Sequence, residues 1–253
     1  MIRCVFWIFY FSSILFLACT SSPAKRGAEA IVDHTLDAYH SKLFDKSTIE
    51  FNLGNQLWKS KRLNGKYTYE RIFDSTGMTI HDEFANAVMT RFISNRLIPL
   101  EGKHLSQLID EINTEMHFFS TPFGLDDSSV IRQYIGEVTI LGKKYDKIKI
   151  DFKPAPGDFL YHDDHYVYWV NKENHLIDYI GYDFTRNDQS HTLFRKSINQ
   201  RKINGLTVQD YVMYKPLHDS IPSKLESLDE AFSGNQLQET GRIVYQNVKV
   251  NYN

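Results

Sequence analysis

The densest group of metal-capable side chains in the sequence is the run His162-Asp163-Asp164-His165. Imidazole nitrogen and carboxylate oxygen both bind zinc, and a catalytic zinc needs three such ligands and one open position. Neighbouring side chains of an extended segment point to opposite faces, so His162 and Asp164 share one face and Asp163 and His165 share the other. The run alone therefore supplies two ligands to any one ion.

A third ligand for such a site has to come from elsewhere, and His117 and His191 are the candidates. The alternative interpretation is a polar loop that leads into a strand over residues 166–170. We expect that alternative and no resident metal or other cofactor, with His162 and Asp164 as weak candidate ligands. A metal-assisted hydrolase centred on residues 162–165 remains a second hypothesis. Residues 20–253 contain no Gly-x-Ser-x-Gly elbow, P-loop or cysteine nucleophile.

Arginines on strand faces are a second possible source of recognition chemistry. Two sets of residues share a face by alternation, namely Arg195, Ser197, Asn199 and Arg201 in one strand and Tyr67, Tyr69 and Arg71 in another. If these faces line a cavity, the guanidinium groups can bind a carboxylate, a phosphate or a lipid head group. Structural pairing of the arginines with Asp82 or Asp178 is the alternative.

Aromatic side chains are the third resource, because the chain has 17 Phe, 15 Tyr and 3 Trp. Amphipathic aromatic rings can line an apolar cavity while their polar tips orient a ligand, although they more often fill a core. We take Phe119, Phe123, Tyr166 and Trp169 as candidate ligand-binding residues, together with Tyr69, Arg71, Arg195, Asn199 and Arg201.

Elements that could position these residues follow from the hydrophobic periodicity. Apolar residues at helical spacing predict helices over residues 28–44 and 105–119, and a short helical segment over 227–232. Alternation with a period of two predicts strands at 67–73, 78–84, 136–141, 145–152, 166–170, 176–184, 193–202, 206–214 and 241–252. The Asn204-Gly205 dipeptide is a strong hairpin signal.

Successive hairpins favour an antiparallel sheet and argue against a parallel α/β fold. We predict an α+β, β-dominated fold in which a large curved antiparallel sheet, a half-barrel, packs around one or two long helices. The architecture is similar to that of bacterial lipoprotein carriers.

The N-terminus resembles a lipoprotein signal. Residues 5–18 are almost entirely apolar, follow Arg3 and end in Leu15-Phe16-Leu17-Ala18-Cys19. The similarity to the bacterial lipobox implies cleavage before Cys19, which then carries the lipid. An ordinary secretory signal is the alternative. We predict a signal peptide at 1–18, lipidated Cys19 and a flexible tether over 19–27, and one globular domain over 28–253. The formal net charge of −2 offers no basic surplus for nucleic-acid binding.

The stretch Phe119-Ser120-Thr121-Pro122-Phe123-Gly124-Leu125-Asp126-Asp127 resembles a motif of a family of uncharacterised envelope lipoproteins found mainly in Bacteroidota. Further similar segments follow in the same order, among them Gly142-Lys143-Lys144-Tyr145-Asp146-Lys147, His162-Asp163-Asp164 and Asn199-Gln200-Arg201. The resemblance implies no established activity. Some relatives carry an aldolase label, but Lys143, Lys144, Lys147 and Lys149 fit the solvated face of a strand better than a Schiff-base site.

These observations favour a membrane-anchored envelope lipoprotein that binds or carries an apolar or amphiphilic ligand without chemistry. Its expected location is the outer membrane, facing the periplasm, because acidic residues do not directly follow Cys19. The expected partners are the membrane, through the lipid anchor, and a lipid or other amphiphile. An assembly scaffold for another envelope protein is a further hypothesis.

Overall fold

A computed structural model describes residues 23–153, 164–186, 189–218 and 224–253 of the chain. The strands in these ranges form two antiparallel sheets of seven strands each, sheet A and sheet B. Each sheet is largely a meander in which consecutive strands pair. The signal peptide, Cys19 and the first part of the expected tether lie outside the described residues.

Sheet A follows the order β14-β1-β2-β3-β4-β5-β6. Its strands are β1 (Ser47–Leu53), β2 (Gln56–Leu63), β3 (Lys66–Ser75), β4 (Met78–Ala85), β5 (Val88–Ile93), β6 (Arg96–Ile98) and β14 (Gln246–Tyr252). The β2–β3 hairpin turns at Asn64 and Gly65, whose φ angles are 54° and 76°. Two successive positive φ angles form the tight loop that matches the twist of paired strands. The Asn64-Gly65 dipeptide is a sequence signal for the β2–β3 hairpin. The hydrophobic periodicity did not predict β2.

Sheet B contains β7 (Val130–Ile140), β8 (Lys143–Phe152), β9 (His165–Asn171), β10 (Ile177–Arg186), β11 (Gln189–Ile203), β12 (Leu206–Pro216) and β13 (Leu237–Ile243). Asn204 and Gly205 form the predicted turn, with Ile203 paired to Leu206. The single strand predicted over 241–252 is wrong, because it is two strands in different sheets. Between them the backbone N–H of buried Tyr245 donates a hydrogen bond to Asp210 (3.0 Å).

The helices are α1 (Pro23–Tyr39), α2 (Gly102–Ser120) and α3 (Leu228–Ser233), with 3-10 turns η1 (Ser41–Lys46) and η2 (Leu225–Ser227). The predicted first helix ends at Tyr39, because His40 takes a left-handed conformation with φ 54°. Since α1 begins at Pro23, the last five residues of the expected tether are helical. No helix in the described ranges has the length and apolarity needed to cross a membrane.

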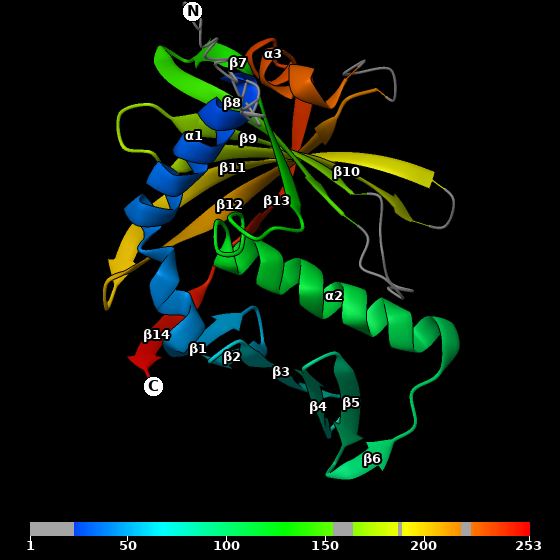
Figure 1. The fold of residues 1–253 in the computed structure, drawn as a ribbon. Helices are drawn as coiled ribbons and strands as arrows, with labels where there is room; N and C mark the ends of the chain where they lie inside the picture. The colour runs from blue at the N-terminus through cyan, green and yellow to red at the C-terminus, as the bar shows by residue number, and fades with distance from the viewer. Residues whose placement is uncertain (1–22, 154–163, 187–188, 219–223) are drawn as a thin grey trace, which may run out of the picture.

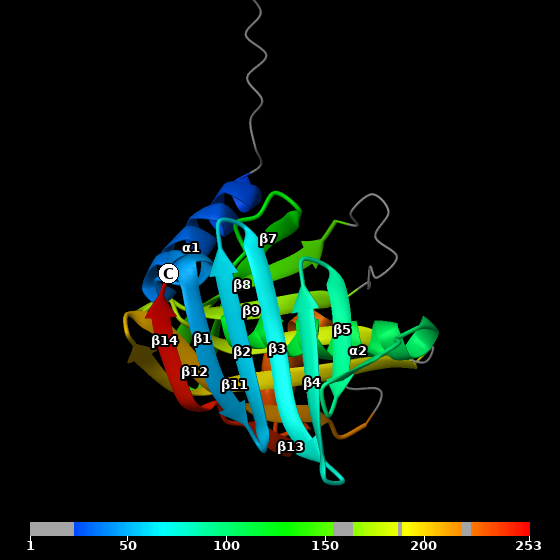
Figure 2. The same cartoon turned by 90° about the horizontal axis from the view of Figure 1, so that it is seen from below.

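Helix α2 connects the two sheets and runs between them (Figure 1). Seen from below, sheet A lies in front of α2 and the strands of sheet B cross behind (Figure 2). The main hydrophobic cluster fills the space between the sheets and includes Ile112 and Met116 of α2. A second cluster covers the other face of sheet B beneath α3. The predicted β-dominated fold, with curved antiparallel sheet and two long helices, is confirmed.

Candidate functional site

A pocket of about 580 Å³ lies along the polar side of α2, where the helix faces both sheets. Sheet A contributes Leu53, Gln56, Trp58 and Arg71. Sheet B contributes Tyr166, Tyr182 and Phe184, together with Asp164, which directly precedes β9. Helix α2 contributes Lys103, Ser106, Gln107, Asp110, Glu111, Thr114 and Glu115. One side of the pocket is thus mainly aromatic, and the helical side is polar.

The helical side of the pocket arises from the amphipathic pattern of α2. Leu108, Ile109, Ile112 and Met116 recur every three or four residues and are buried against the core. Polar residues at intervening helical positions point away from that core, and those named above line the pocket.

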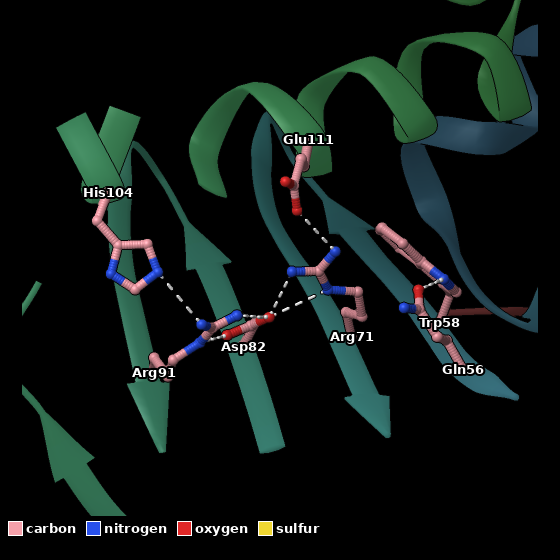
Figure 3. Close-up of polar contacts among 7 residues, drawn as sticks. All are labelled: Gln56, Trp58, Arg71, Asp82, Arg91, His104 and Glu111. Atoms are coloured by element: carbon pink, nitrogen blue, oxygen red, sulfur yellow. Dashed lines mark hydrogen bonds and ion pairs between the residues drawn. The ribbon is translucent and has the colours of Figure 1, made fainter. Parts of the chain in front are cut away.

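Arg71 enters the pocket from β3 and is bound by two carboxylates (Figure 3). Its Nε and Nη2 donate hydrogen bonds to Oδ2 of Asp82 at 3.0 and 2.8 Å. Its Nη1 donates a hydrogen bond to Oε2 of Glu111 on α2 at 3.1 Å. The side chain of Asp82 is fully buried, so the interaction is shielded from solvent. Arg71 is accordingly neutralised before any ligand enters.

Asp82 also binds a second arginine, Arg91 of β5 (Figure 3). Arg91 donates from Nε to Oδ1 at 2.5 Å and from Nη2 to Oδ2 at 2.9 Å. These hydrogen bonds raise the pKa of Arg91 above its ordinary value. Nη1 of Arg91 lies 3.5 Å from Nε2 of His104 on α2. The cluster therefore joins β3, β4 and β5 to the N-terminal half of α2.

Arg195 of β11 lies behind the aromatic side of the pocket. Its guanidinium carbon is 3.2 Å from the centre of the Phe118 ring. Nε and Nη2 donate hydrogen bonds to the hydroxyl of Tyr182 at 3.4 and 3.3 Å. Nη1 is buried and has no hydrogen-bond partner in the described part of the chain. Burial lowers the pKa of Arg195, but the neighbouring Tyr182, Tyr245 and Glu115 outweigh it and the pKa is raised.

His117 lies near Arg195, enclosed by the rings of Phe118, Phe152 and Tyr166. Loss of solvent and the positive charge of Arg195 lower the pKa of His117 to about 4. Its Nε2 is 3.1 Å from the hydroxyl of Tyr168. His117 is therefore neutral at pH 7, with one ring nitrogen close to the Tyr168 hydroxyl. Its role as a third metal ligand stays a prediction, because a neutral imidazole is the form that binds a metal ion.

Two of the candidate ligand-binding residues, Arg71 and Tyr166, line the pocket. Tyr69 is buried and accepts a hydrogen bond from Nη1 of Arg62 (2.6 Å). Phe119 stacks on Phe51 with ring centres 4.1 Å apart. Tyr69 thus packs within sheet A, and Phe119 packs α2 against that sheet.

The remaining candidates lie away from the pocket. Phe123 contacts Phe44 with ring centres 5.0 Å apart. Trp169 is fully buried in the second cluster, because alternation along β9 turns it away from Tyr166. Asn199 and Arg201 both bind Asp210 of β12. The predicted grouping of Arg195, Asn199 and Arg201 fails because β11 has an irregular register between Ile198 and Arg201.

Metal-capable residues form no group of three within the described ranges. His165 is bound to Asp151, with Nδ1 and Oδ1 2.6 Å apart. Asp164 lines the pocket. His162 and Asp163 lie outside the described residues. His191 packs on Phe184, with ring centres 5.3 Å apart.

Sequence reasoning missed Trp58, Tyr182, Phe184 and the polar residues of α2. The apolar stripe of α2 could have indicated its polar face, because positions between the apolar residues must point elsewhere. No local signal connects that face with Tyr182, since β10 follows α2 only after three other strands.

Residues 7–240 of the chain match a family with the description "Family of unknown function (DUF6503)". A comparison with curated proteins finds no match. The family description agrees with the resemblance to proteins of unassigned function.

Three solved structures are similar to this chain at TM-scores below 0.5. A LolA superfamily protein from Nitrosomonas europaea is 11% identical, with 88% of this chain and 92% of that chain covered and a TM-score of 0.49. A putative outer membrane lipoprotein-sorting protein domain from Vibrio parahaemolyticus is 12% identical (90% and 93% covered, TM-score 0.44). A DUF1329 family protein from Desulfovibrio piger is 14% identical (89% and 93% covered, TM-score 0.42). These likenesses concern the course of the backbone and say nothing of a ligand.

Proposed function

We propose that this chain, which belongs to a family of unknown function, binds or carries an apolar or amphiphilic ligand in the pocket along α2. It would do so without catalysing a reaction. The observation that carries this proposal is the pocket of about 580 Å³ itself. Small-molecule sites have volumes of roughly 300–1,000 Å³, so a single-chain amphiphile fits the available space.

The composition of the pocket supports an amphiphile. Trp58, Tyr166, Tyr182 and Phe184 offer apolar ring surface for a chain. Apolar area removed from water stabilises a complex by roughly 25 cal/mol per Å² before the costs of association. The polar residues of α2 on the other side, such as Gln107 and Thr114, can bind the polar part of the ligand or the water around it.

The expected lipid anchor completes the proposal. Cleavage before Cys19 and acylation of that cysteine would hold the body at a membrane, in our proposal the periplasmic side of the outer membrane. Multiple acyl chains contribute about 0.8 kcal/mol for each buried methylene, which makes such an anchor long-lived. The ligand site would then lie close to a membrane surface, where amphiphiles are abundant.

The test uses residues 20–253 produced in a bacterial periplasm. All residues of both described hydrophobic clusters lie at or beyond Ala28, so this chain contains all of the described packing. Native mass spectrometry combined with solvent extraction should reveal a discrete adduct that passes into organic solvent. A metal-sized adduct would instead favour the hydrolase hypothesis.

A matched pair of variants locates the ligand. Thr114 lines the pocket, whereas its neighbour Asn113 is also exposed on α2 but does not line it. Thr114→Trp should fill the pocket and reduce binding of a fluorescent C16 probe at least tenfold, while Asn113→Trp should leave it unchanged. Equal binding by the two variants, or no amphiphile bound by the unmodified chain, contradicts the proposal.

A further inference from the structure

No carboxylate among the described residues forms a hydrogen bond with the positively charged guanidinium group of Arg195. The guanidinium group stays protonated at any ordinary pH, and Arg195 is only 4% exposed. A buried charge is costly unless ion pairs or hydrogen bonds replace the lost water. The hydrogen-bond partners of each guanidinium nitrogen therefore show whether the protein itself satisfies this charge.

The hydrogen bonds of Arg195 are longer and fewer than those of an arginine paired with a carboxylate. The face of the guanidinium lies on the Phe118 ring in a cation–π contact, with the guanidinium carbon 3.2 Å from the ring centre. Nε and Nη2 share the Tyr182 hydroxyl at 3.4 and 3.3 Å, whereas bonds from arginine to a carboxylate are about 2.7–2.9 Å. Nη1 has no partner among the described residues. Arg195 can therefore donate hydrogen bonds to a further, stronger acceptor.

Tyr182 separates this cation from the pocket. Its side chain lines the pocket, and its hydroxyl binds Arg195. The ring stacks on Tyr166 and on Phe184 with centres 5.8 Å apart in both cases. These neighbours also line the pocket. The Tyr182 hydroxyl is thus the group that links the lining of the pocket to the guanidinium group.

We propose that the ligand is a single-chain amphiphile with an acidic head group, carboxylate or phosphate, and that Arg195 binds this head group after the Tyr182 hydroxyl gives way. The inference rests on the proposed function and assigns the ligand class of the same pocket. The acyl chain lies along the aromatic side, and the acidic oxygen atoms accept hydrogen bonds from Arg195.

Arg195 is a better head-group site than Arg71, the arginine that lines the pocket. Arg71 already binds Asp82 and Glu111, so a ligand anion would have to compete with two carboxylates. The opposing influence is Glu115, which lines the pocket and accepts a hydrogen bond from Tyr245 (2.6 Å). Its negative charge disfavours an acidic head group and favours an amine, which makes head-group charge the decisive variable.

The experiment measures dissociation constants of residues 20–253 for palmitic acid, a single-chain lysophosphatidic acid, hexadecanol and hexadecylamine. A charge-assisted hydrogen bond corresponds to about tenfold or more in affinity, so at least one acid should bind tenfold more tightly than the alcohol. The tighter of the two acids identifies the head group as carboxylate or phosphate. Equal binding of acids and alcohol, or a preference for the amine, overturns the inference.

Variants then assign the preference to Arg195. Arg195→Met should reduce the affinity for the preferred acid to that for hexadecanol and leave hexadecanol binding unchanged. Lys202→Met removes an exposed cation from the same strand and should leave the preference intact. Retention of the preference in Arg195→Met contradicts the assignment.

Tyr182→Phe keeps the test informative if Arg195→Met does not fold. Removal of the hydroxyl frees Nε and Nη2 of Arg195, so the affinity for the acid should rise relative to the affinity for hexadecanol. Unchanged acid binding in this variant overturns the role of the hydroxyl. Failure of the unmodified chain to bind any of the four probes would refute the proposed function itself.

Discussion

Arg71 and Arg195 are two buried arginines with opposite surroundings. Arg71, on sheet A, is bound by Asp82 and Glu111, and Asp82 also binds Arg91. Arg195, on sheet B, lies among aromatic rings and has a nitrogen without a partner in the described part of the chain. The comparison teaches that burial alone does not distinguish a structural arginine from a binding one. The completeness of its hydrogen bonding does.

The largest expected effect comes from breaking the complete cluster. Asp82→Asn leaves Arg71 and Arg91 without their shared buried carboxylate, and removal of one partner from a buried ion pair typically costs about 3–5 kcal/mol. Chemical denaturation should show a loss of stability of this size. Glu239→Gln, which breaks the exposed pair with Arg242, is the control and should cost less than about 1 kcal/mol. A similar loss in both variants contradicts the structural role of Asp82.

The next effect concerns His117, whose imidazole lies near the charge of Arg195. The pKa of His117 is about 4 in the folded protein, against about 6.5 for an unperturbed histidine. As the pH falls from 7 to 4, the unfolded chain takes up a proton on this histidine before the folded protein does. The free energy of unfolding is therefore unaffected by His117 above about pH 6.5 and decreases as the pH falls towards 4. The expected contribution to this loss is about 3 kcal/mol.

His117→Gln isolates that contribution, because an amide can still hydrogen-bond with Tyr168 but does not titrate. The free energy of unfolding should be measured by urea denaturation at pH 7, 5.5 and 4. The variant should lose about 3 kcal/mol less than the unmodified protein over this range, since the carboxylates titrate in both. Parallel pH profiles would show that His117 is protonated in the fold without penalty.

The smallest expected change in stability comes from replacing each of the two arginines in turn, which compares them directly. Arg71→Met should destabilise the protein by about 2 kcal/mol, because Asp82 then keeps only Arg91. Arg195→Met should change stability by less than about 1 kcal/mol, since replacing a poorly paired buried charge by an apolar side chain of similar size is often neutral or stabilising. Thermal and chemical denaturation of the two variants side by side measure the difference. The reverse order would mean that Arg195, and not Arg71, is the structural residue.

The sequence predicted local geometry well because strand registers follow from turns. A tight turn at Thr76 and Gly77 pairs Ser75 with Met78, and the same register places Arg71 opposite Asp82. The expected structural alternative for Arg71, pairing with Asp82, is therefore what the fold contains. The same reasoning failed at β11, where the irregularity after Ile198 breaks the alternation on which the grouping of Arg195 with Asn199 and Arg201 relied.

By itself the sequence determined the β-dominated class, the two long helices and the hairpins, because periodicity and turn residues act over short distances along the chain. Only the tertiary structure decided which side chains share the pocket. Tyr182 and Arg195 are brought together by the pairing of β10 with β11. Phe118 joins them only because α2 crosses between the two sheets, and no local pattern encodes that crossing. The distinction between a paired and an unpaired arginine depends on such long-range contacts, which arise only when the sheets and helix pack together.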